Sequence, residues 1–582
     1  GKTTLLDILA GRSSSSRSMS IKGSVLLNGK KPKSSDYKKK TGYVKQEDLF
    51  ISTVTVREAL AFSAKLRLPA ETPADEKEYV VDEVLSLLEI GHIANSYIGG
   101  GQIRGISGGE KKRTAIGVEL VKKPDLLFLD EPTTGLDSSM AFTVCKILRK
   151  VADQSRSVIC TIHQPKYSIL KKFDKLMLLS GGRVVYFGPV DKAVDYFANL
   201  NLFVPKHRNP ADFFLDCIRV RSTDNPEDED NAHSATKEEV DKLVEAYENS
   251  PICYKPSEKR DLAASTLDLV GTDEQQPTFS ASWITQFGLL FQRALLRAFR
   301  DPLIIGFELP NYILMSIVML MLYTNVDDDQ EGARDRLAAS FFAILSTSLG
   351  PVFAVVVYFP PERAVFNRES SSGFYSVSAY YIATALSTFP IQFIGTVLLQ
   401  LITYWAVPFR SGAGPFFVHY VLLLLGALIS DSLGLAISAA VPSVGFGNIL
   451  AALLVLLWLN FVSFFVPNPP NFWVWAQYSS YLRYAVDAYI VDEFTGRTFT
   501  CAEEPCPIPN EYVTVNNETV NLQDLDWNCT IPCQYSDGES VLKLQQIDDV
   551  SVWKNIVILI GFLIGFRILG YLFLRYLKVG KS

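Results

Sequence analysis

Six apolar runs in the second half of the chain limit the folds that this sequence can adopt. The 582 residues are 48% hydrophobic, and the mean hydropathy of +0.15 is high for a soluble protein of this length. A helix needs about 20 apolar residues to cross the hydrocarbon core of a bilayer. Buried helices of a soluble domain are the alternative, and six such runs argue against it. We therefore predict an all-α membrane domain with spans at about 303–323, 338–359, 378–407, 415–441, 446–466 and 552–577.

The charges that flank these runs predict their orientation. Arginines precede the first run and basic residues follow the last, whereas the loops after the first and fifth runs are acidic. The positive-inside rule then places the N-terminal domain, a loop at 360–376 and the C-terminus on the cytosolic side. We expect the membrane to be the plasma membrane or an endomembrane. Residues 283–300 repeat apolar side chains at helical spacing, which predicts an amphipathic connecting helix at the cytosolic interface.

The N-terminal half contains a short apolar run from Asp125 that ends in two carboxylates, Asp130 and Glu131. Such a run is typical of a strand buried on both faces, whose carboxyl end meets a ligand crevice. There Asp130 can bind Mg²⁺ while Glu131 polarises an attacking water. The alternative is a solvated acidic turn before Pro132.

Two flanking segments argue against a simple acidic turn. Ser107-Gly108-Gly109 opens a helical stretch, so that backbone N–H groups and a helix N-terminus can bind an anion. A second β-type run ends at His163, one of five histidines, where an imidazole can sense a terminal phosphate.

The chain opens with Gly1-Lys2-Thr3-Thr4, the tail of the phosphate-binding pattern G-x-x-x-x-G-K-[ST]. In that pattern Lys2 reaches the β- and γ-phosphates, and the Thr3 hydroxyl binds Mg²⁺. The first glycine and the strand before it are not in the sequence, so we expect the chain to begin within the motif.

Four further motifs carry a family resemblance. ISGGEKKR resembles the signature motif of ABC proteins, LLFLDEP resembles a Walker B motif with its catalytic glutamate, TTGLDSS resembles the D-loop, and TIHQP resembles the H-loop, all in the family order. The order of domains resembles subfamily G half-transporters of the multidrug and pigment type. The resemblance implies an α/β P-loop nucleotide-binding domain followed by an all-α six-helix transmembrane domain.

The resemblance also implies a site and a partner. ATP and Mg²⁺ are the expected cofactors, Glu131 and His163 the catalytic residues, and Thr3, Gln46 and Asp130 the Mg²⁺ ligands. The expected ATP contacts are Gly1, Lys2, Thr3, Thr4, Gln46, Ser107, Gly108, Gly109, Glu110, Asp130 and Asp137. In this family the Lys2 and Ser107 positions of different chains close over one ATP, which implies a second half-transporter, in a homodimer or a heterodimer.

The predicted domains are a nucleotide-binding domain at 1–220, a polar and partly disordered linker at 221–278, and a transmembrane domain at 279–582. The segment after Pro360-Pro361 resembles the family's coupling loop. A solvated loop is the alternative, which two adjacent apolar side chains argue against. The predicted coupling residues are Glu362, Arg363, Val365, Phe366 and Arg368.

A large external loop is predicted at 467–550. It carries four of the eight cysteines, which on an oxidising side favour disulfides of open connectivity, with zinc as the weaker alternative. Two glycosylation sequons lie in the same loop. The disulfide candidates are Cys501, Cys506, Cys529 and Cys533, the glycosylation candidates are Asn517 and Asn528, and the expected free thiols are Cys145, Cys160, Cys217 and Cys253.

In relatives the second and fifth spans line the substrate cavity, and here those spans are largely apolar. This favours a lipophilic or amphipathic cargo, against the alternative of plain helix packing. Glu308 and Asp431 lie within predicted spans, where buried acids are costly and mark candidate functional sites unless they lie near the interface. The predicted cavity residues are Phe342, Ser346, Leu349, Phe353, Leu454, Leu457, Asn460, Phe461, Phe464 and Phe465.

Three functions remain open at this stage. The first is ATP-driven export of lipophilic small molecules. The second is transport of a sterol, lipid or pigment precursor by an obligate heterodimer, and the third is a non-transporting, ATP-gated membrane regulator. The net charge of −6 gives no reason to expect a nucleic-acid partner.

Overall fold

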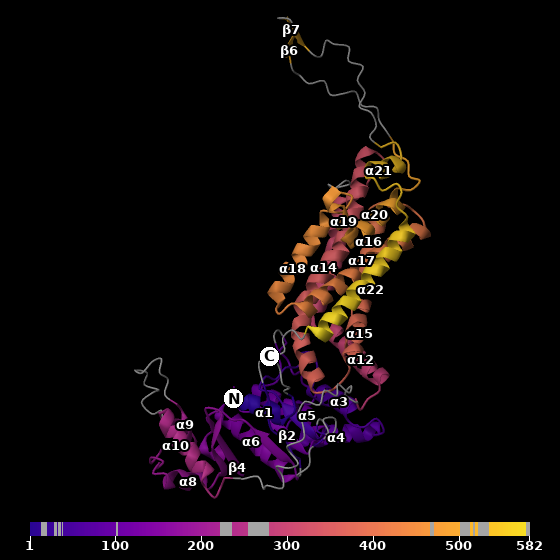
Figure 1. Ribbon diagram of the computed structural model, residues 1–582. Helices are drawn as coiled ribbons and strands as arrows, with labels where there is room; N and C mark the ends of the chain where they lie inside the picture. Colours follow the sequence, from indigo (N-terminus) through magenta and orange to yellow (C-terminus); the bar gives the residue numbers. More distant parts are fainter. Residues whose placement is uncertain are drawn as a thin grey trace. The chain divides into compact units, whose positions relative to one another are not determined.

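The structure is a computed structural model, and its chain divides into two compact units (Figure 1). The first comprises Gly1–Gln286 with Arg368–Ser376, and the second comprises Phe287–Asn367 with Val377–Ser582. All four disulfide candidates (Cys501, Cys506, Cys529 and Cys533) and both sequon asparagines (Asn517 and Asn528) lie outside the described residues. The structure describes residues 1–12, 20–27, 32, 37, 39–100, 103–220, 236–253, 279–465, 471–500, 512–515, 518–521 and 535–577.

A parallel sheet forms the centre of the first unit. Its order is β1 (Thr41–Val44), β2 (Leu126–Leu129) and β3 (Ser157–Cys160), and all neighbours pair in parallel. All four residues of β2 are buried, as an apolar run in a central strand requires. The register places Val44, Leu129 and Cys160 side by side, so the three strands end at one edge of the sheet.

Three helices of this part have marked N-terminal caps. Thr55 and Ser107 each begin a helix with a capping box, and Asp137 caps the next one. The helices of this part are α1 (Lys2–Leu9), α3 (Val56–Arg67), α4 (Ala74–Leu87), η1 (Gly91–Ile93), α5 (Gly108–Leu120), α6 (Ser138–Asp153) and α7 (Tyr167–Leu170).

An antiparallel pair, β4 (Lys175–Ser180) and β5 (Arg183–Pro189), forms a smaller core with α8 (Ala193–Asn199), α9 (Pro210–Ile218) and α10 (Lys237–Glu248). Helix α10 lies inside the predicted linker. Its apolar side, which includes Leu243 and Val244, is buried in this core, so this part of the linker belongs to the folded unit. A separate two-stranded pair, β6 (Tyr512–Val515) and β7 (Glu518–Asn521), lies in the predicted external loop.

The second unit is helical, and a helix lies at each of the six apolar runs (Figure 1). This confirms the predicted fold class. Its elements are α12 (Trp283–Arg300, which begins in the first unit), α13 (Pro302–Leu322), α14 (Gln330–Ser371), α15 (Val377–Ser387), α16 (Phe389–Ala406), α17 (Ala413–Ala440), α18 (Val444–Leu459), η3 (Asn471–Trp473), α19 (Val474–Ser479), α20 (Tyr481–Phe494), α21 (Gly538–Leu544) and α22 (Val552–Tyr576).

Length and composition allow some of these helices to cross a bilayer on their own. Among the described residues, four segments are long and apolar enough: Gln330–Ser371, Val377–Ala406, Ala413–Ala440 and Val552–Tyr576. The other two predicted spans contain shorter apolar helices, Glu308–Leu322 and Val444–Leu459. The number of six spans therefore stays a prediction.

Part of the predicted external loop is helical core. Helix α20 packs against α17, α18 and α22, and Tyr481, Tyr489 and Phe494 are fully buried in it. The prediction of a loop is therefore wrong for residues 481–494, because this helix completes the core.

The predicted loop at 360–376 is also wrong over most of its length. Helix α14 continues to Ser371 with Pro360 and Pro361 inside it. Proline removes a backbone donor and normally ends a helix. Here tertiary contacts outweigh that effect, because the side chains that follow the two prolines are buried within the helical unit.

We predict that Gly434→Leu destabilises the helical unit. A Cβ at Gly434 of α17 would lie 2.8 Å from the Val352 carbonyl oxygen and 2.9 Å from the Val355 Cβ. Overpacking of this kind costs about 1–3 kcal/mol, so the thermal unfolding midpoint of the detergent-solubilised protein should fall. Gly561→Leu on α22 is the matched control, since a Cβ there meets nothing within 4 Å. Equal midpoints for the two variants would contradict this packing.

Candidate nucleotide site

The carboxyl ends of the three parallel strands bring together side chains from distant parts of the sequence. The Thr3 hydroxyl donates to Asp130 Oδ1 at 3.3 Å, and the Thr161 hydroxyl donates to the same oxygen at 2.6 Å. Asp130 directly follows β2 and is buried. Thr3 lies in the first turn of α1, so the start of the chain meets the central strand at this edge.

Glu131 is held from several sides. Its Oε2 accepts hydrogen bonds from Gln46 Nε2 at 3.1 Å and from the Thr134 hydroxyl at 3.0 Å, and its Oε1 lies 3.6 Å from the Lys2 ammonium. Its backbone φ of +46° lies in the left-handed region, which is strained for a residue with a Cβ. The Glu131 N–H donates to the Thr161 hydroxyl at 2.9 Å, which helps to hold this conformation.

The donor set at this edge fits a magnesium ion. Mg²⁺ prefers oxygen ligands and usually binds one or two carboxylates together with water and substrate phosphates. Asp130, the Thr3 hydroxyl and the Gln46 amide oxygen are donors of this kind. Among the described residues no cluster of three or more His, Cys, Asp or Glu could enclose a metal. The ion would therefore depend on these few groups and on the phosphates themselves.

The start of α5 is a second anion-binding feature. Ser107 and Gly108 are exposed, and Ser107 N and Oγ both donate to Glu110 Oε2, at 2.9 and 2.8 Å. The other Glu110 oxygen lies 3.4 Å from His92 Nε2. Gly109 allows α6 to approach, because a Cβ there would lie 2.8 Å from Met140 Sδ. The predicted phosphate contact of Ser107 is thus an internal helix cap in this state.

The remaining predicted ATP-site residues lie near these two groups. Gly1 and Thr4 are exposed at the first turn of α1, and His163 is exposed just beyond the end of β3. Asp137 accepts from the backbone N–H groups of Ser139 and Met140 at 2.8 and 2.9 Å, so its carboxylate caps α6.

Sequence reasoning missed Thr161. It follows β3 directly, and the pairing of Leu129 with Cys160 makes Thr161 the neighbour of Asp130. A threonine after a strand is unremarkable by itself. The signal would have been the register of the sheet, which the sequence does not provide.

Four of the five predicted coupling residues pack within the helical unit. Glu362 forms an ion pair with Arg297, and the Arg363 guanidinium donates to the carbonyl oxygens of Ser438 and Val441 at the end of α17. Val365 and Phe366 are buried, and the Phe366 ring stacks on Tyr380 with centroids 4.4 Å apart. Their apolar character is explained by this core, so it no longer argues for docking elsewhere.

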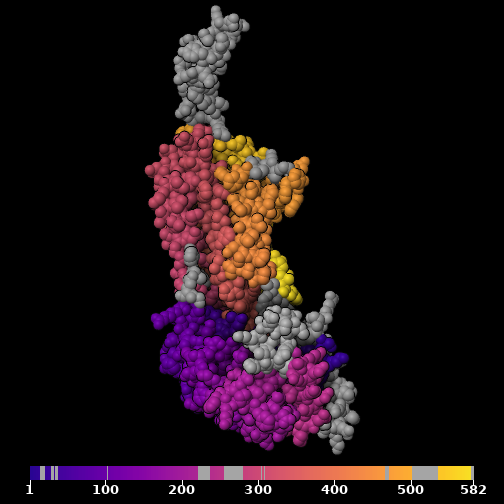
Figure 2. Space-filling view, turned by 90° about the vertical axis from the view of Figure 1, so that its left-hand side faces the viewer, coloured from indigo at the N-terminus to yellow at the C-terminus, as the bar shows by residue number. Residues whose placement is uncertain are grey.

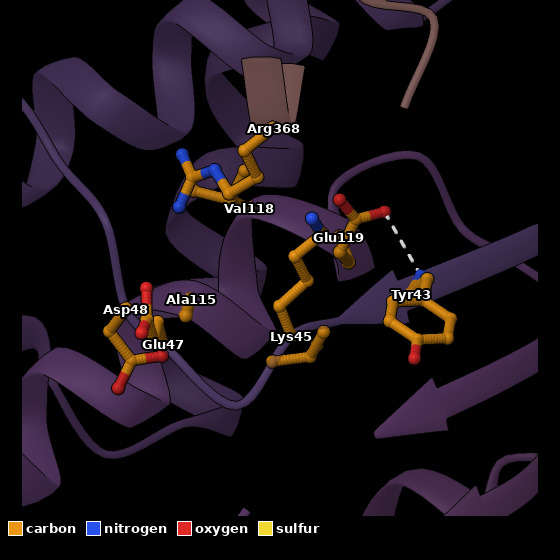
Figure 3. Close-up of a pocket in the computed structure, with 9 residues that line it drawn as sticks. Tyr43, Lys45, Glu47, Asp48, Ala115, Val118, Glu119 and Arg368 are labelled. Atoms are coloured by element: carbon orange, nitrogen blue, oxygen red, sulfur yellow. Dashed lines mark hydrogen bonds between the residues drawn. The ribbon is translucent and has the colours of Figure 1, made fainter. Parts of the chain in front are cut away.

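Arg368 is different, because it belongs to the first unit. Its guanidinium lies 4.8 Å from the centre of the Phe50 ring. With Tyr43, Lys45, Asp48, Glu119 and others it lines a small pocket, which Figure 3 shows beside the hydrogen bond from Tyr43 N to Glu119 Oε2 (3.4 Å). Burial raises the pKa of the Asp48 carboxyl, which the nearby Lys112 ammonium opposes.

The predicted cavity residues differ in exposure. Phe342, Leu457, Asn460 and Phe465 are exposed, and Leu349, Phe353, Leu454 and Phe464 are partly buried. Ser346 and Phe461 are buried, and the Ser346 hydroxyl donates to the Ala343 carbonyl at 2.8 Å. Ser346 and Phe461 therefore contribute to packing within the helical unit in this structure.

The two acids in the predicted spans have polar partners. Glu308 accepts from Gln392 at 3.1 Å, and Asp431 pairs with Arg567 at 2.8 Å and accepts from the Thr388 hydroxyl at 3.1 Å. These contacts join α13 to α16 and α17 to α22, so a structural role explains both acids.

The four cysteines of the described residues, Cys145, Cys160, Cys217 and Cys253, are free, as predicted. Burial raises the pKa of the Cys145 thiol to about 12. A thiol of this pKa is protonated at neutral pH and hence a poor nucleophile.

Three features are typical of an ATP-binding cassette ATPase with a membrane domain. They are the polar edge of the parallel sheet, the capped glycine-rich start of α5 and the apolar helical unit. Family models agree with this. One described as "ABC transporter" matches residues 1–134, and two described as "ABC-2 type transporter" match 163–238 and 285–494.

Full-length relatives place the chain more closely. It is 34% identical to the broad substrate specificity ATP-binding cassette transporter ABCG2 of Mus musculus, over 99% of this chain and 87% of the relative. It is 30% identical to ABC transporter G family member 1 of Dictyostelium discoideum, over 99% of this chain and 79% of that relative. A solved structure of cbiO1 from Clostridium perfringens, part of the ABC transporter complex cbiONQ, aligns with 37% of this chain and 82% of its own at 26% identity, with a TM-score of 0.29.

The chain belongs to the G family of ABC transporters. It is accordingly an ATP-binding, ATP-hydrolysing transport ATPase and a multi-pass membrane protein.

We predict that Thr161→Val lowers ATP turnover while Thr161→Ser preserves it. Valine keeps the shape but removes the donor to Asp130 and the acceptor for the Glu131 N–H. A hydrogen bond to a charged group contributes about 1.5–3 kcal/mol, so kcat/KM should fall by roughly tenfold to a hundredfold. Steady-state ATPase assays on the reconstituted protein measure this. Similar activity in Thr161→Val and wild type would exclude the proposed positioning role.

Proposed function

We propose that this chain exports lipophilic or amphipathic small molecules as a dimer of half-transporters, driven by ATP hydrolysis. The observation that carries the proposal is the separation of the predicted ATP contacts into two groups. Lys2, Thr3, Gln46, Asp130 and Glu131 interact with one another at the sheet edge. Ser107 and Glu110 instead form hydrogen bonds with each other at the exposed start of α5.

Two such chains, placed head to tail, complete each other. The Lys2 group of one copy would bind the triphosphate, and the exposed start of the Ser107 helix of the other would cover the γ-phosphate. Thr3, Gln46 and Asp130 would hold Mg²⁺, which would supply charge neutralisation at the phosphates when bound. Glu131 would accept a proton from the attacking water, and the exposed His163 would contact the γ-phosphate.

We place the second copy against an exposed apolar face of the helical unit. Along α18 the side chains of Phe446, Ile449, Leu453 and Leu456 recur at helical spacing and are more than half exposed. The orange surface in Figure 2 includes this helix. A partner helix would cover this face, and the predicted cavity residues Phe342, Leu457 and Phe465 would border the space between copies.

Coupling would pass through the end of α14. Ser372 accepts from Arg12 at 3.0 Å, and the Arg67 guanidinium lies 4.3 Å from the centre of the Phe374 ring. These contacts lie within the first unit, which also contains Arg368. Closure of the nucleotide domains would thus move the segment 368–376, which is continuous with α14.

The proposal places the nucleotide domain in the cytosol and the predicted loop with Cys501 outside. The mouse relative is named for broad substrate specificity, and the exposed apolar side chains among the predicted cavity residues favour a lipophilic cargo. Export by a homodimer is the preferred form because the chain carries both halves of a site. Dependence on a different half-transporter for a sterol, lipid or pigment precursor is the alternative.

We predict complementation between two inactive variants. Lys2→Met removes the phosphate contact of one half-site, and Gly108→Asp places a carboxylate at the exposed helix start of the other. Each variant alone should lose at least about a hundredfold of its ATPase activity, as expected when an essential group is removed. A mixed dimer keeps one intact site, made of Lys2 from one chain and Gly108 from the other.

Co-expressed variants should therefore recover ATPase activity and ATP-dependent uptake of a lipophilic dye into liposomes. Wild type alone and each variant alone are the controls. No recovery, with an active wild type, would contradict shared sites. An inactive purified wild type would favour the heterodimer.

A further inference from the structure

Lys112 lies in α5 five residues after Ser107, and its ammonium is buried. Only 3% of its side chain is exposed. Its Nζ donates to the main-chain carbonyl of Gln46 at 2.8 Å and forms an ion pair with Asp48 Oδ1 at 2.9 Å. Both partners lie in the segment just beyond β1. A buried charge needs such partners, since an unpaired ammonium in this place would be strongly unfavourable.

Gln46 makes a second contact in the opposite direction. Its side-chain Nε2 donates to Glu131 Oε2 at 3.1 Å, while its carbonyl oxygen accepts a hydrogen bond from the Lys112 ammonium. One residue is therefore bonded at once to the proposed catalytic carboxylate and to the helix that begins at Ser107. Two consecutive hydrogen bonds therefore connect Glu131 to Gln46 and Gln46 to Lys112 of α5.

We infer that Lys112 is a positioning residue that makes the two ATP sites of a dimer depend on each other. The inference rests on the proposed function, in which Glu131 serves the chain's own nucleotide and Ser107 serves the partner's. When the Glu131 carboxylate moves, Gln46 moves with it through their hydrogen bond. The Gln46 carbonyl then shifts, and Lys112 must shift too if it is to keep its hydrogen bond to that carbonyl. Helix α5 then shifts with it, and the Ser107 end reaches the second nucleotide.

A purely structural ion pair is the competing explanation, and the two explanations predict different kinetics. If the ion pair is only structural, loss of Lys112 should lower activity only by destabilising the fold. Removal of both the Lys112 and the Asp48 charge should then restore activity. A positioning residue should change turnover more than ATP affinity, because the contacts of Lys2 and Thr3 with nucleotide stay intact. It should also be replaceable by arginine, whose guanidinium can bind the same two oxygens.

The test measures kcat and the KM for ATP of the full-length protein in liposomes, together with its thermal unfolding midpoint. For Lys112→Met we expect kcat to fall at least about tenfold while KM changes less than about threefold. Lys112→Arg should return kcat to within about threefold of wild type. Lys146→Met, at an exposed lysine on α6 outside the site, is the matched control and should behave like wild type.

The variant Lys112→Met with Asp48→Asn separates the two explanations. It removes both buried charges, so the unfolding midpoint should approach that of wild type while kcat stays low. Recovery of kcat together with the midpoint, or an unchanged kcat in Lys112→Met, would overturn the inference alone. A wild type whose ATPase activity shows no dependence on dimer formation would overturn the proposed function and the inference with it.

Discussion

The parallel pairing of β1, β2 and β3 is the interaction on which the nucleotide site depends. Its register sets Val44, Leu129 and Cys160 level, so the residues that follow emerge at one edge. Asp130 meets the Thr161 hydroxyl there, and the left-handed turn at Glu131 sets its carboxylate beside Lys2. These groups are far apart in the sequence, so the site exists only when the sheet has formed.

The sequence predicted the parts of this arrangement that depend on local pattern. Apolar runs of sufficient length became helices, and the run before Asp130 became a fully buried strand, because burial on both faces leaves no polar position in it. Partnerships between distant segments could not be predicted. Thr161 needed the strand register, and the helix through Pro360 and Pro361 needed the contacts of Arg297 with Glu362 and of Arg363 with the end of α17.

The separation of the site into two groups has a physical consequence. The Glu131 group is held by hydrogen bonds from several segments, whereas the Ser107 donors bind Glu110 within their own helix. In the proposed dimer a phosphate would replace Glu110 as the acceptor. ATP can therefore favour a closed dimer only through the contacts that it adds between copies. Helix α5 and the Gln46 segment move together in this scheme, since Lys112 joins them.

Nucleotide trapping by Glu131→Gln tests the shared site most directly. This variant keeps the shape of the side chain but cannot accept the proton of the attacking water, so ATP should remain bound after closure. Size-exclusion chromatography with radiolabelled ATP and Mg²⁺ separates the two assembly states. We expect trapped ATP to elute with the dimer, at about one nucleotide per chain by the symmetry of the pair, and its loss on dilution to monomers. ATP trapped equally well by a monomer would contradict the account.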